Sequence, residues 1–273
     1  MRIHVWGCRG SLATPGRDAA AYGGNTSCVE VRSASRRLIV LDGGTGIRSL
    51  GLSVEPDVTE IDILLTHMHL DHVEGLGFFA PFFDPARTIR FWGPRPGELT
   101  LADQVALYLS PPFFPRTFGT FGAAVEFNEV WEDTWSLDGV RITSRPVEHP
   151  GPTVGYRLEE DGRALAYIPD NEIGISPEAG AELAQGADVL FHDAQYTREE
   201  YDVRVGWGHS ALDDYAAYVA RAKPKRSLMF HHDPAHGSHD LESMLAAAQG
   251  HTDGVPVELA SEGMDFTLDG DLN

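Results

Sequence analysis

The stretch that decides the fold reads Ile61-Asp62-Ile63-Leu64-Leu65-Thr66-His67-Met68-His69-Leu70-Asp71-His72. An apolar run typical of a buried β-strand ends directly in a cluster of histidine and aspartate. His67 and His69 lie two residues apart, so their side chains point the same way if the extended geometry continues. Asp71 and His72 then follow on the turn into a helix that we expect from Val73. Imidazole and carboxylate are ligands of zinc, manganese and iron, and four of them here can serve two neighbouring ions.

Further candidate ligands follow later apolar runs of the sequence. His149 comes after residues 145–148, Asp170 after 167–169, and His231-His232-Asp233 after 227–230. A rigid α/β scaffold assembles a site from distant sequence by placing ligands at strand ends. A lone histidine or aspartate is more often a capping or hydrogen-bonding residue. Their common position after strand-like runs favours a shared metal site, in which either His231 or His232 is the last ligand.

The pattern of apolar residues predicts an α/β protein. We expect strands at 2–6, 26–32, 38–41, 61–65, 88–92, 141–147, 153–159, 163–168, 187–191 and 226–230, and helices from 73 and at 97–109, 177–185, 212–222 and 241–249. Two β-rich portions, each followed by helices, indicate sheets stacked between outer helices. No repeat or linker divides the chain, so we expect one domain over residues 1–273.

The order His67-x-His69-x-Asp71-His72, then His149, Asp170 and His231, resembles the metallo-β-lactamase superfamily. The resemblance implies a four-layer αββα sandwich, with two mixed β-sheets between outer helices and a dinuclear metal site. It implies that His67, His69 and His149 hold one divalent ion. Asp71, His72 and His231 would hold the other, and Asp170 would bridge them. Zn²⁺ or Mn²⁺ suits this ligand set, and iron is also compatible with it.

Three glycine-containing loops are similar to those of the ribonuclease Z-like phosphodiesterase branch of this superfamily: Gly7-Cys8-Arg9-Gly10-Ser11, Gly24-Asn25-Thr26-Ser27 and Leu41-Asp42-Gly43-Gly44-Thr45-Gly46. Asp193 and His209 resemble the acidic residue and the histidine that this branch uses beside the metals. A departing alkoxide needs a proton or a positive hydrogen bond, and a carboxylate keeps the imidazole oriented. Two alternatives stay open. In the first, His192 replaces Asp193 as the functional residue. In the second, His209 is a surface residue that caps the helix from Ala211, although Ser210 is the better cap.

The sequence departs from ribonuclease Z proper in ways that favour a small substrate. Only 20 residues separate His149 from Asp170, which leaves no long arm to grip tRNA. The formal charge of −20, from 21 basic and 41 acidic side chains, repels long nucleic acids. Two cysteines cannot supply the cysteine-rich second metal site of a related phosphodiesterase group.

We therefore expect a phosphodiesterase that cleaves a small phosphodiester such as a 3′,5′-cyclic nucleotide by attack of a hydroxide held between two ions. Asp71 would orient the hydroxide, and His209, held by Asp193, would stabilise or protonate the departing oxygen. The alternatives are a lactone or thioester hydrolase, a tRNA 3′-end endonuclease and a non-catalytic nucleotide sensor. Aromatic residues at 78–83 and 108–116 could wall a pocket or stack a base, although such residues more often form core or a dimer contact.

Several features favour a cytoplasmic protein with no membrane partner. Cys8 and Cys28 fit reduced thiols, although a bridge between them stays open. The start of the chain lacks the apolar stretch of a signal peptide, and no apolar run approaches the roughly 20 residues that span a bilayer. Family resemblance favours a homodimer.

Overall fold

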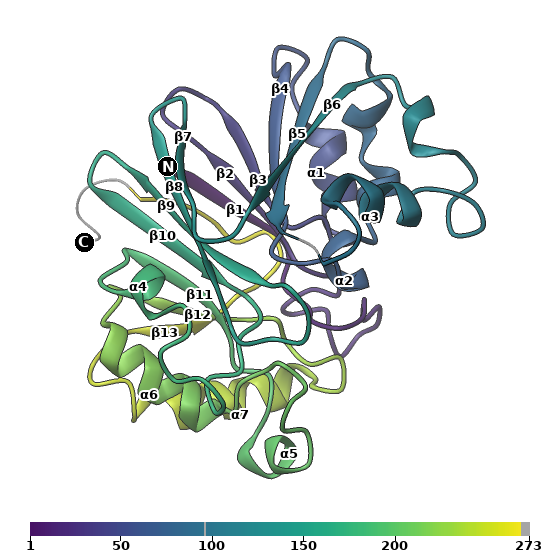
Figure 1. The fold of residues 1–273 in the computed structure, drawn as a ribbon. Helices are drawn as coiled ribbons and strands as arrows, with labels where there is room; N and C mark the ends of the chain where they lie inside the picture. Colours follow the sequence, from purple (N-terminus) through teal and green to yellow (C-terminus); the bar gives the residue numbers. More distant parts are fainter. Residues whose placement is uncertain (96, 269–273) are drawn as a thin grey trace.

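The computed structural model describes residues 1–95 and 97–268, and its strands form two sheets that face each other (Figure 1). The first sheet has seven strands in the order β14-β1-β2-β3-β4-β5-β6. These are β1 Arg2–Gly7, β2 Cys28–Arg32, β3 Leu38–Leu41, β4 Glu60–Leu64, β5 Thr88–Pro94, β6 Ala124–Val130 and β14 Asp265–Thr267.

The second sheet also has seven strands, in the order β13-β12-β11-β10-β9-β8-β7. These are β7 Thr134–Leu137, β8 Val140–Pro146, β9 Val154–Glu160, β10 Arg163–Ile168, β11 Val189–Asp193, β12 Ser227–Phe230 and β13 Val257–Leu259. Both sheets are mixed. Strands β3 to β6 of the first sheet run parallel, as do β10 to β13 of the second, and the other neighbours are antiparallel.

Helices cover the outer faces of the sheets (Figure 1). The first sheet carries α1 Ile47–Ser53, α2 Leu70–Val73, α3 Leu101–Tyr108 and the 3₁₀ turns η1 Leu76–Phe78, η2 Ala80–Phe83 and η3 Phe118–Thr120. The second carries α4 Ala181–Ala184, α5 Arg198–Asp202, α6 Leu212–Ala222 and α7 Ser238–Gln249. The four-layer αββα arrangement and the α/β class expected from the sequence are therefore confirmed.

Alternation along the strands directs most of the buried apolar residues into three large cores. In β10, Leu165 and Tyr167 pack into the core between the sheets, whereas Ala166 and Ile168 pack against the helices of the second sheet. Successive side chains of a strand point to opposite faces, so a strand covered on both faces reads as a continuous apolar run. Burying a large apolar side chain in such a core is worth about 1.5–3 kcal/mol. The third core lies between the first sheet and α1 and α3.

Strand direction gathers the candidate ligands at one edge of the sandwich. The chain leaves β4 into His67, β10 into Asp170 and β12 into His231. β8 runs parallel to β10, because both pair antiparallel with β9 between them, so His149 leaves the sheet at the same end. The candidate ligands that follow strands of both sheets therefore meet at one site.

The structure corrects several expected elements. The helix expected from Val73 in fact ends there: α2 begins at Leu70, with His69 as its N-cap, so Asp71 and His72 belong to the helix itself. The helix expected at 97–109 begins only at Leu101, where Thr100 and Asp103 form a capping box. The expected helix at 177–185 shortens to α4. Strands β6, β7, β13 and β14 and helices α1 and α5 were not predicted.

Three expectations concern features outside the site. Cys8 and Cys28 are both free and buried, so the bridge left open by the sequence is not formed. Across the described residues, no helix has the length and apolar character that crossing a membrane requires. The expectation of one domain over 1–273 includes residues 96 and 269–273, which lie outside the described residues.

Candidate metal centre

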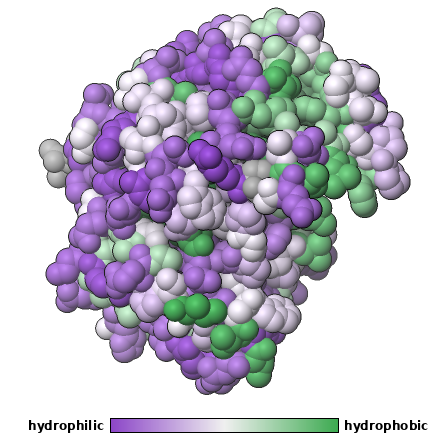
Figure 2. Space-filling view, viewed as in Figure 1, coloured by the Kyte–Doolittle hydropathy of each residue, from purple (hydrophilic) through white to green (hydrophobic). Residues whose placement is uncertain are grey.

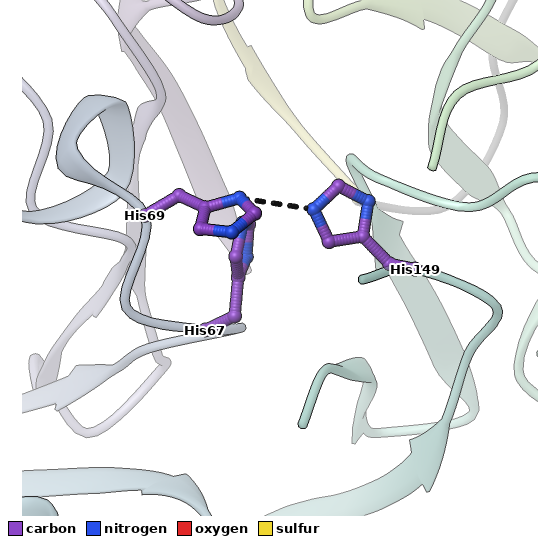
Figure 3. A group of neighbouring side chains, drawn as sticks. All are labelled: His67, His69 and His149. Carbon is purple, nitrogen blue, oxygen red and sulfur yellow. Dashed lines mark hydrogen bonds between the residues drawn. The ribbon is translucent and has the colours of Figure 1, made fainter. Parts of the chain in front are cut away.

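Three histidines from both sheets converge on one point (Figure 3). His67 and His69 lie on one segment, and His149 faces them from another. His69 Nδ1 lies 3.1 Å from His149 Nε2, and one donor atom of each residue lies within 4.8 Å of the others. Two nitrogens bound to one zinc ion at about 2.0–2.1 Å in tetrahedral geometry lie roughly 3.3 Å apart. The spacing of this trio therefore fits a shared ion.

A second trio lies beside the first. His231 Nε2 is 2.9 Å from Asp71 Oδ2 and 3.2 Å from His72 Nε2, and the distance from His72 Nε2 to Asp71 Oδ2 is also 3.2 Å. All three side chains are buried. These separations again match the edges of a coordination polyhedron around one ion.

Asp170 lies between the two trios and turns one oxygen toward each. Its Oδ2 is 3.7 Å from His67 Nε2 and 3.8 Å from His149 Nε2. Its Oδ1 is 3.3 Å from the Nε2 atoms of both His72 and His231. The structure thus brings together all seven sequence-predicted metal ligands, with Asp170 where a bridging carboxylate would stand.

Buried polar atoms of this cluster lack protein partners. Within residues 1–95 and 97–268, His67 Nε2 and Asp170 Oδ1 make no hydrogen bond. A buried polar atom left unsatisfied costs about 1–3 kcal/mol, a cost that a coordinated cation removes. Burial also lowers the pKa of His67 and His69, and lowers that of His149 to about 4. These imidazoles are therefore neutral at neutral pH, which is the form that binds a metal.

The second nitrogen of several candidate ligands is held by the protein. His72 Nδ1 contacts Asp42 Oδ2 at 2.8 Å, and His231 Nδ1 contacts Gln195 Oε1 at 2.9 Å. Such partners fix the tautomer and the ring orientation of a ligand histidine. Asp42 belongs to the Asp-Gly turn noticed in the sequence. Gln195 was missed, because a single glutamine two residues after β11 carries no local signal.

His231 rather than His232 points into the cluster. His231 has a φ of +57°, so the backbone leaves the extended conformation of β12 at this residue. His232 Nε2 instead donates to the carbonyl of Ala260 at 2.9 Å, and burial lowers the pKa of His232 to about 3. The backbone at Gly10 passes so close that a Cβ there would lie 2.2 Å from His231 Nδ1.

Asp193 and His209 stand next to the bridging position. His209 is buried, and its Nδ1 lies 3.5 Å from Asp193 Oδ2 and 4.0 Å from Asp170 Oδ2. Burial opposes protonation of His209, but Asp193 and Asp170 outweigh it and raise the pKa. His192 points instead toward the helix layer, where its ring centre lies 4.9 Å from that of Tyr218.

Ser210 is not the helix cap that the sequence favoured. Its Oγ donates to the carbonyl oxygen of Asn171, and α6 begins after Ala211 without a side-chain cap. The Ser210 N–H donates to Asp193 Oδ2 at 2.8 Å. Asp193 therefore holds the backbone that follows His209 and stands 3.5 Å from the Nδ1 atom of the His209 ring.

Glu172 is a second residue that no sequence pattern singled out. Its buried carboxylate accepts hydrogen bonds from Gly206 N and Gly208 N at 2.7 Å each and from Tyr201 Oη at 3.0 Å. The carbonyl of Gly208 in turn lies 2.8 Å from His149 Nδ1. Gly208 has a φ of +91°, and a Cβ there would lie 2.0 Å from the same nitrogen. Glu172 thus fixes the loop that orients His149 and carries His209.

The aromatic residues singled out in the sequence divide between core and surface. Phe79 and Phe82 are buried against the first sheet, whereas Phe78 and Phe113 are exposed. A cavity of about 210 Å³ opens on His67 and His69. Neither buried phenylalanine lines it.

Comparisons with known proteins identify the family and the fold of the chain. Residues 37–232 match the model of the β-lactamase superfamily domain. A ribonuclease Z of Mycolicibacterium paratuberculosis is 31% identical over 211 residues, which cover 70% of each protein. The metallo-β-lactamase fold protein YhfI of Bacillus subtilis has a TM-score of 0.72 at 17% identity, over 97% of this chain and 98% of its own. Zn²⁺-bound PqqB of Methylobacterium extorquens has a TM-score of 0.72 at 20% identity, over 98% and 100%.

Proposed function

The chain belongs to the β-lactamase superfamily and to its ribonuclease Z-like branch, and from this premise we propose that it is a phosphodiesterase for small phosphodiesters such as 3′,5′-cyclic nucleotides. The protein is a metallo-β-lactamase-fold hydrolase with a His/Asp metal-binding cluster. The position of His209 supports the phosphodiesterase activity. Its imidazole lies 4.0 Å from the bridging carboxylate and 3.5 Å from Asp193, where a proton can reach a departing ester oxygen.

We assign two divalent ions to the cluster. His67, His69 and His149 would hold one and Asp71, His72 and His231 the other, with Asp170 shared between them. Zn²⁺ is supported by the zinc-bound relative PqqB, and Mn²⁺ suits the same donors. When bound, such ions polarise a phosphoryl oxygen and lower the pKa of a water molecule.

The remaining catalytic roles fall to side chains of the protein. Asp71, whose Oδ2 accepts the N–H of Ser11 at 2.7 Å, would orient the attacking water. Protonated His209 would donate its proton to the ester oxygen as the phosphorus–oxygen bond breaks, and Asp193 would keep its ring directed at that oxygen. The proton lost by the attacking water restores His209, so the reaction balances as hydrolysis.

A small substrate is supported by charge and by the shape of the second sheet. The formal charge of −20 opposes the approach of a polyanion. Between His149 and Asp170, β9 and β10 form a hairpin whose turn is Asp161-Gly162. That short turn is no arm for a tRNA, and a cavity of about 210 Å³ beside His67 and His69 suits a compact phosphodiester.

Processing of tRNA 3′ ends is the second candidate, because the 31% identical relative is a ribonuclease Z. A precursor tRNA with a 3′ trailer tests it directly. Cleavage of the precursor at rates above those for cyclic nucleotides would replace our proposal. We further propose a cytoplasmic homodimer in which residues 1–273 form one domain.

The first experiment measures hydrolysis of 3′,5′-cyclic AMP and bis-p-nitrophenyl phosphate with added Zn²⁺ or Mn²⁺, with a chelator control and a lactone for comparison. We expect metal-dependent cleavage of both phosphodiesters. Cleavage of the lactone alone, with metals bound, would refute the phosphodiesterase. His209→Ala should lower kcat about 100-fold or more while metal content stays intact. His251→Ala, which removes an exposed histidine, is the matched control.

A further inference from the structure

Gln195 is a buried amide in the loop after β11, beside the ion that we assign to Asp71, His72 and His231. Figure 2 shows a largely hydrophilic surface on one face of the molecule, and glutamine side chains ordinarily lie on such a surface. The side chain of Gln195 is instead only 2% exposed. Buried amides are hydrogen-bonded in native proteins, so the partners of Gln195 show which residues it holds.

The amide joins three residues by hydrogen bonds. Its Nε2 donates to Asp233 Oδ2 at 3.1 Å and to Ser11 Oγ at 3.3 Å. Its Oε1 lies 2.9 Å from His231 Nδ1. The carboxylate of Asp233 is itself fixed, because its Oδ1 accepts a hydrogen bond from the N–H of Ala235 at 2.8 Å.

The carboxylate of Asp233 determines which way the amide faces. An ionised carboxylate accepts hydrogen bonds and cannot donate them, so the group of Gln195 beside it must be the NH₂ group. The carbonyl oxygen of the amide therefore faces His231, whose Nδ1 must carry the proton that it donates. A neutral His231 then has its lone pair on Nε2. That nitrogen lies 3.2 Å from His72 Nε2 and 3.3 Å from Asp170 Oδ1, inside the candidate metal centre.

Ser11 connects the same amide to a second ligand of this ion. The N–H of Ser11 donates to Asp71 Oδ2 at 2.7 Å, while its Oγ accepts from Gln195. Asp71 Oδ2 in turn lies 2.9 Å from His231 Nε2. Gln195, Ser11, Asp71 and His231 therefore form a closed ring of contacts around one side of the ion's position.

The ligands of the other proposed ion have different partners. His149 Nδ1 lies 2.8 Å from the carbonyl oxygen of Gly208, and His67 Nδ1 lies 3.1 Å from Thr66 Oγ1. Across residues 1–95 and 97–268, the only candidate ligand with a hydrogen bond to Gln195 is His231. An effect of Gln195 on metal binding should therefore be confined to one ion.

We propose that Gln195 is a positioning residue for the ion held by Asp71, His72 and His231. Oriented by Asp233, it fixes the tautomer of His231 and, through Ser11, the place of Asp71. The inference rests on the assignment of two ions in the proposed function, but not on cleavage of any phosphodiester. Loss of such a partner of a ligand histidine costs about 10–100-fold in metal affinity.

The test titrates the metal-free, full-length protein with Zn²⁺ in competition with a chromophoric chelator, which measures the affinity for each ion. Gln195→Met removes the hydrogen bonds at similar side-chain size and should weaken one of the two ions about 10–100-fold. The weakened ion should be the one whose binding His231→Ala abolishes, and the other should bind as in the wild type. Gln249→Met, which changes an exposed glutamine of α7, is the matched control and should bind both ions normally.

A second pair of variants uses the contact with Asp233. Gln195→Glu keeps an acceptor for His231 but sets a carboxylate against Asp233, so it should also weaken that ion. Adding Asp233→Asn supplies an NH₂ group to the new carboxylate and should restore most of the affinity. A residue that merely supported the fold would instead lower the affinity for both ions together.

Wild-type affinity for both ions in Gln195→Met overturns the inference, and so does equal weakening of both. A wild type that binds a single Zn²⁺ also overturns it, because there is then no second ion to position. If Gln195→Met does not fold, the absence of rescue by Asp233→Asn in Gln195→Glu has the same consequence. Two bound Zn²⁺ ions, a selective loss in Gln195→Met and no hydrolysis of any diester would refute the phosphodiesterase while confirming the role of Gln195.

Discussion

Replacing Glu172 by glutamine tests whether this residue positions the centre from outside it. Gly206 N–H and Tyr201 O–H donate to Oε1, and Gly208 N–H donates to Oε2. A carboxamide has one oxygen, so whichever way it turns, its NH₂ group faces a backbone N–H. One hydrogen bond to a charged acceptor is lost, and a buried donor is left unpaired. A loss of about 2–3 kcal/mol of unfolding free energy follows, which corresponds to a fall in Tm of roughly 5–10 °C.

Catalysis should suffer more than stability. Gly208 contacts His149 and precedes His209, so the disturbed loop moves one candidate ligand and the proposed proton donor. A displacement on the order of 1 Å costs about 100-fold in rate. We expect kcat for bis-p-nitrophenyl phosphate to fall by that factor and the optimum of its pH profile to shift, since the surroundings of His209 change.

The matched control is Glu199→Gln, which removes an exposed carboxylate from α5 on the same loop region. It should leave kcat and the pH profile unchanged and alter Tm by no more than about 1–2 °C. The reasoning is refuted if Glu172→Gln shows the Tm, kcat and pH profile of the wild type. A fall in Tm with an unchanged pH profile would reduce Glu172 to a purely structural role.

The remaining predictions concern metals, a buried ion pair and an exposed one. Removal of the metal ions by a chelator should lower the Tm by roughly 5–10 °C in calorimetry, and added Zn²⁺ or Mn²⁺ should restore it. The reason is that a ligand at 100 times its Kd adds about 2.7 kcal/mol to the unfolding free energy. An unchanged melting curve would argue against a preformed site. Arg37→Met should lower the unfolding free energy by about 3–5 kcal/mol in urea titrations, because Arg37 Nε pairs at 2.6 Å with the fully buried Asp62. The control Arg36→Met changes a 70% exposed side chain and should have little effect. Hydrogen bonds from Arg2 and then His4 lower the pKa of Asp265 to about 2, so its stabilising contribution is present above pH 3.8 and is lost as pH falls through 2. The difference in unfolding free energy between wild type and Asp265→Asn, at most about 1 kcal/mol for such a surface pair, should therefore narrow between pH 5 and pH 2 in thermal melts. A difference that is undiminished at pH 2 would contradict the assignment.

The residues of the candidate centre were predictable where local spacing places them. His67, His69, Asp71 and His72 follow one strand directly, and strand direction explains why the ligands after β8, β10 and β12 meet them. The choice between His231 and His232 was not predictable, because it depends on a φ of +57° at His231 that no neighbouring residue signals. Gln195 and Glu172 act through contacts with residues distant in sequence, which periodicity does not report.

The elements of the fold that were not predicted also depend on contacts between residues distant in sequence or on segments too short to show a pattern. Strands β13 and β14 have three residues each, too few to display an alternating pattern. β14 exists because Asp265–Thr267 pairs with β1 at the opposite end of the chain. Helix α2 was misplaced because its single turn contains two candidate ligands, whose polar side chains hide the helical pattern.

Because the candidate ligands are divided between the two halves of the chain, metal binding would depend on whether the two halves have assembled. The chain up to β6 supplies His67, His69, Asp71 and His72, and the chain from β7 onward supplies His149, Asp170 and His231. For either proposed ion, two donors come from each half, so neither half alone offers three. A fragment or a misdocked intermediate would release metal that the assembled sandwich retains. Metal stoichiometry would thus count the molecules whose halves have closed on each other, independently of any substrate.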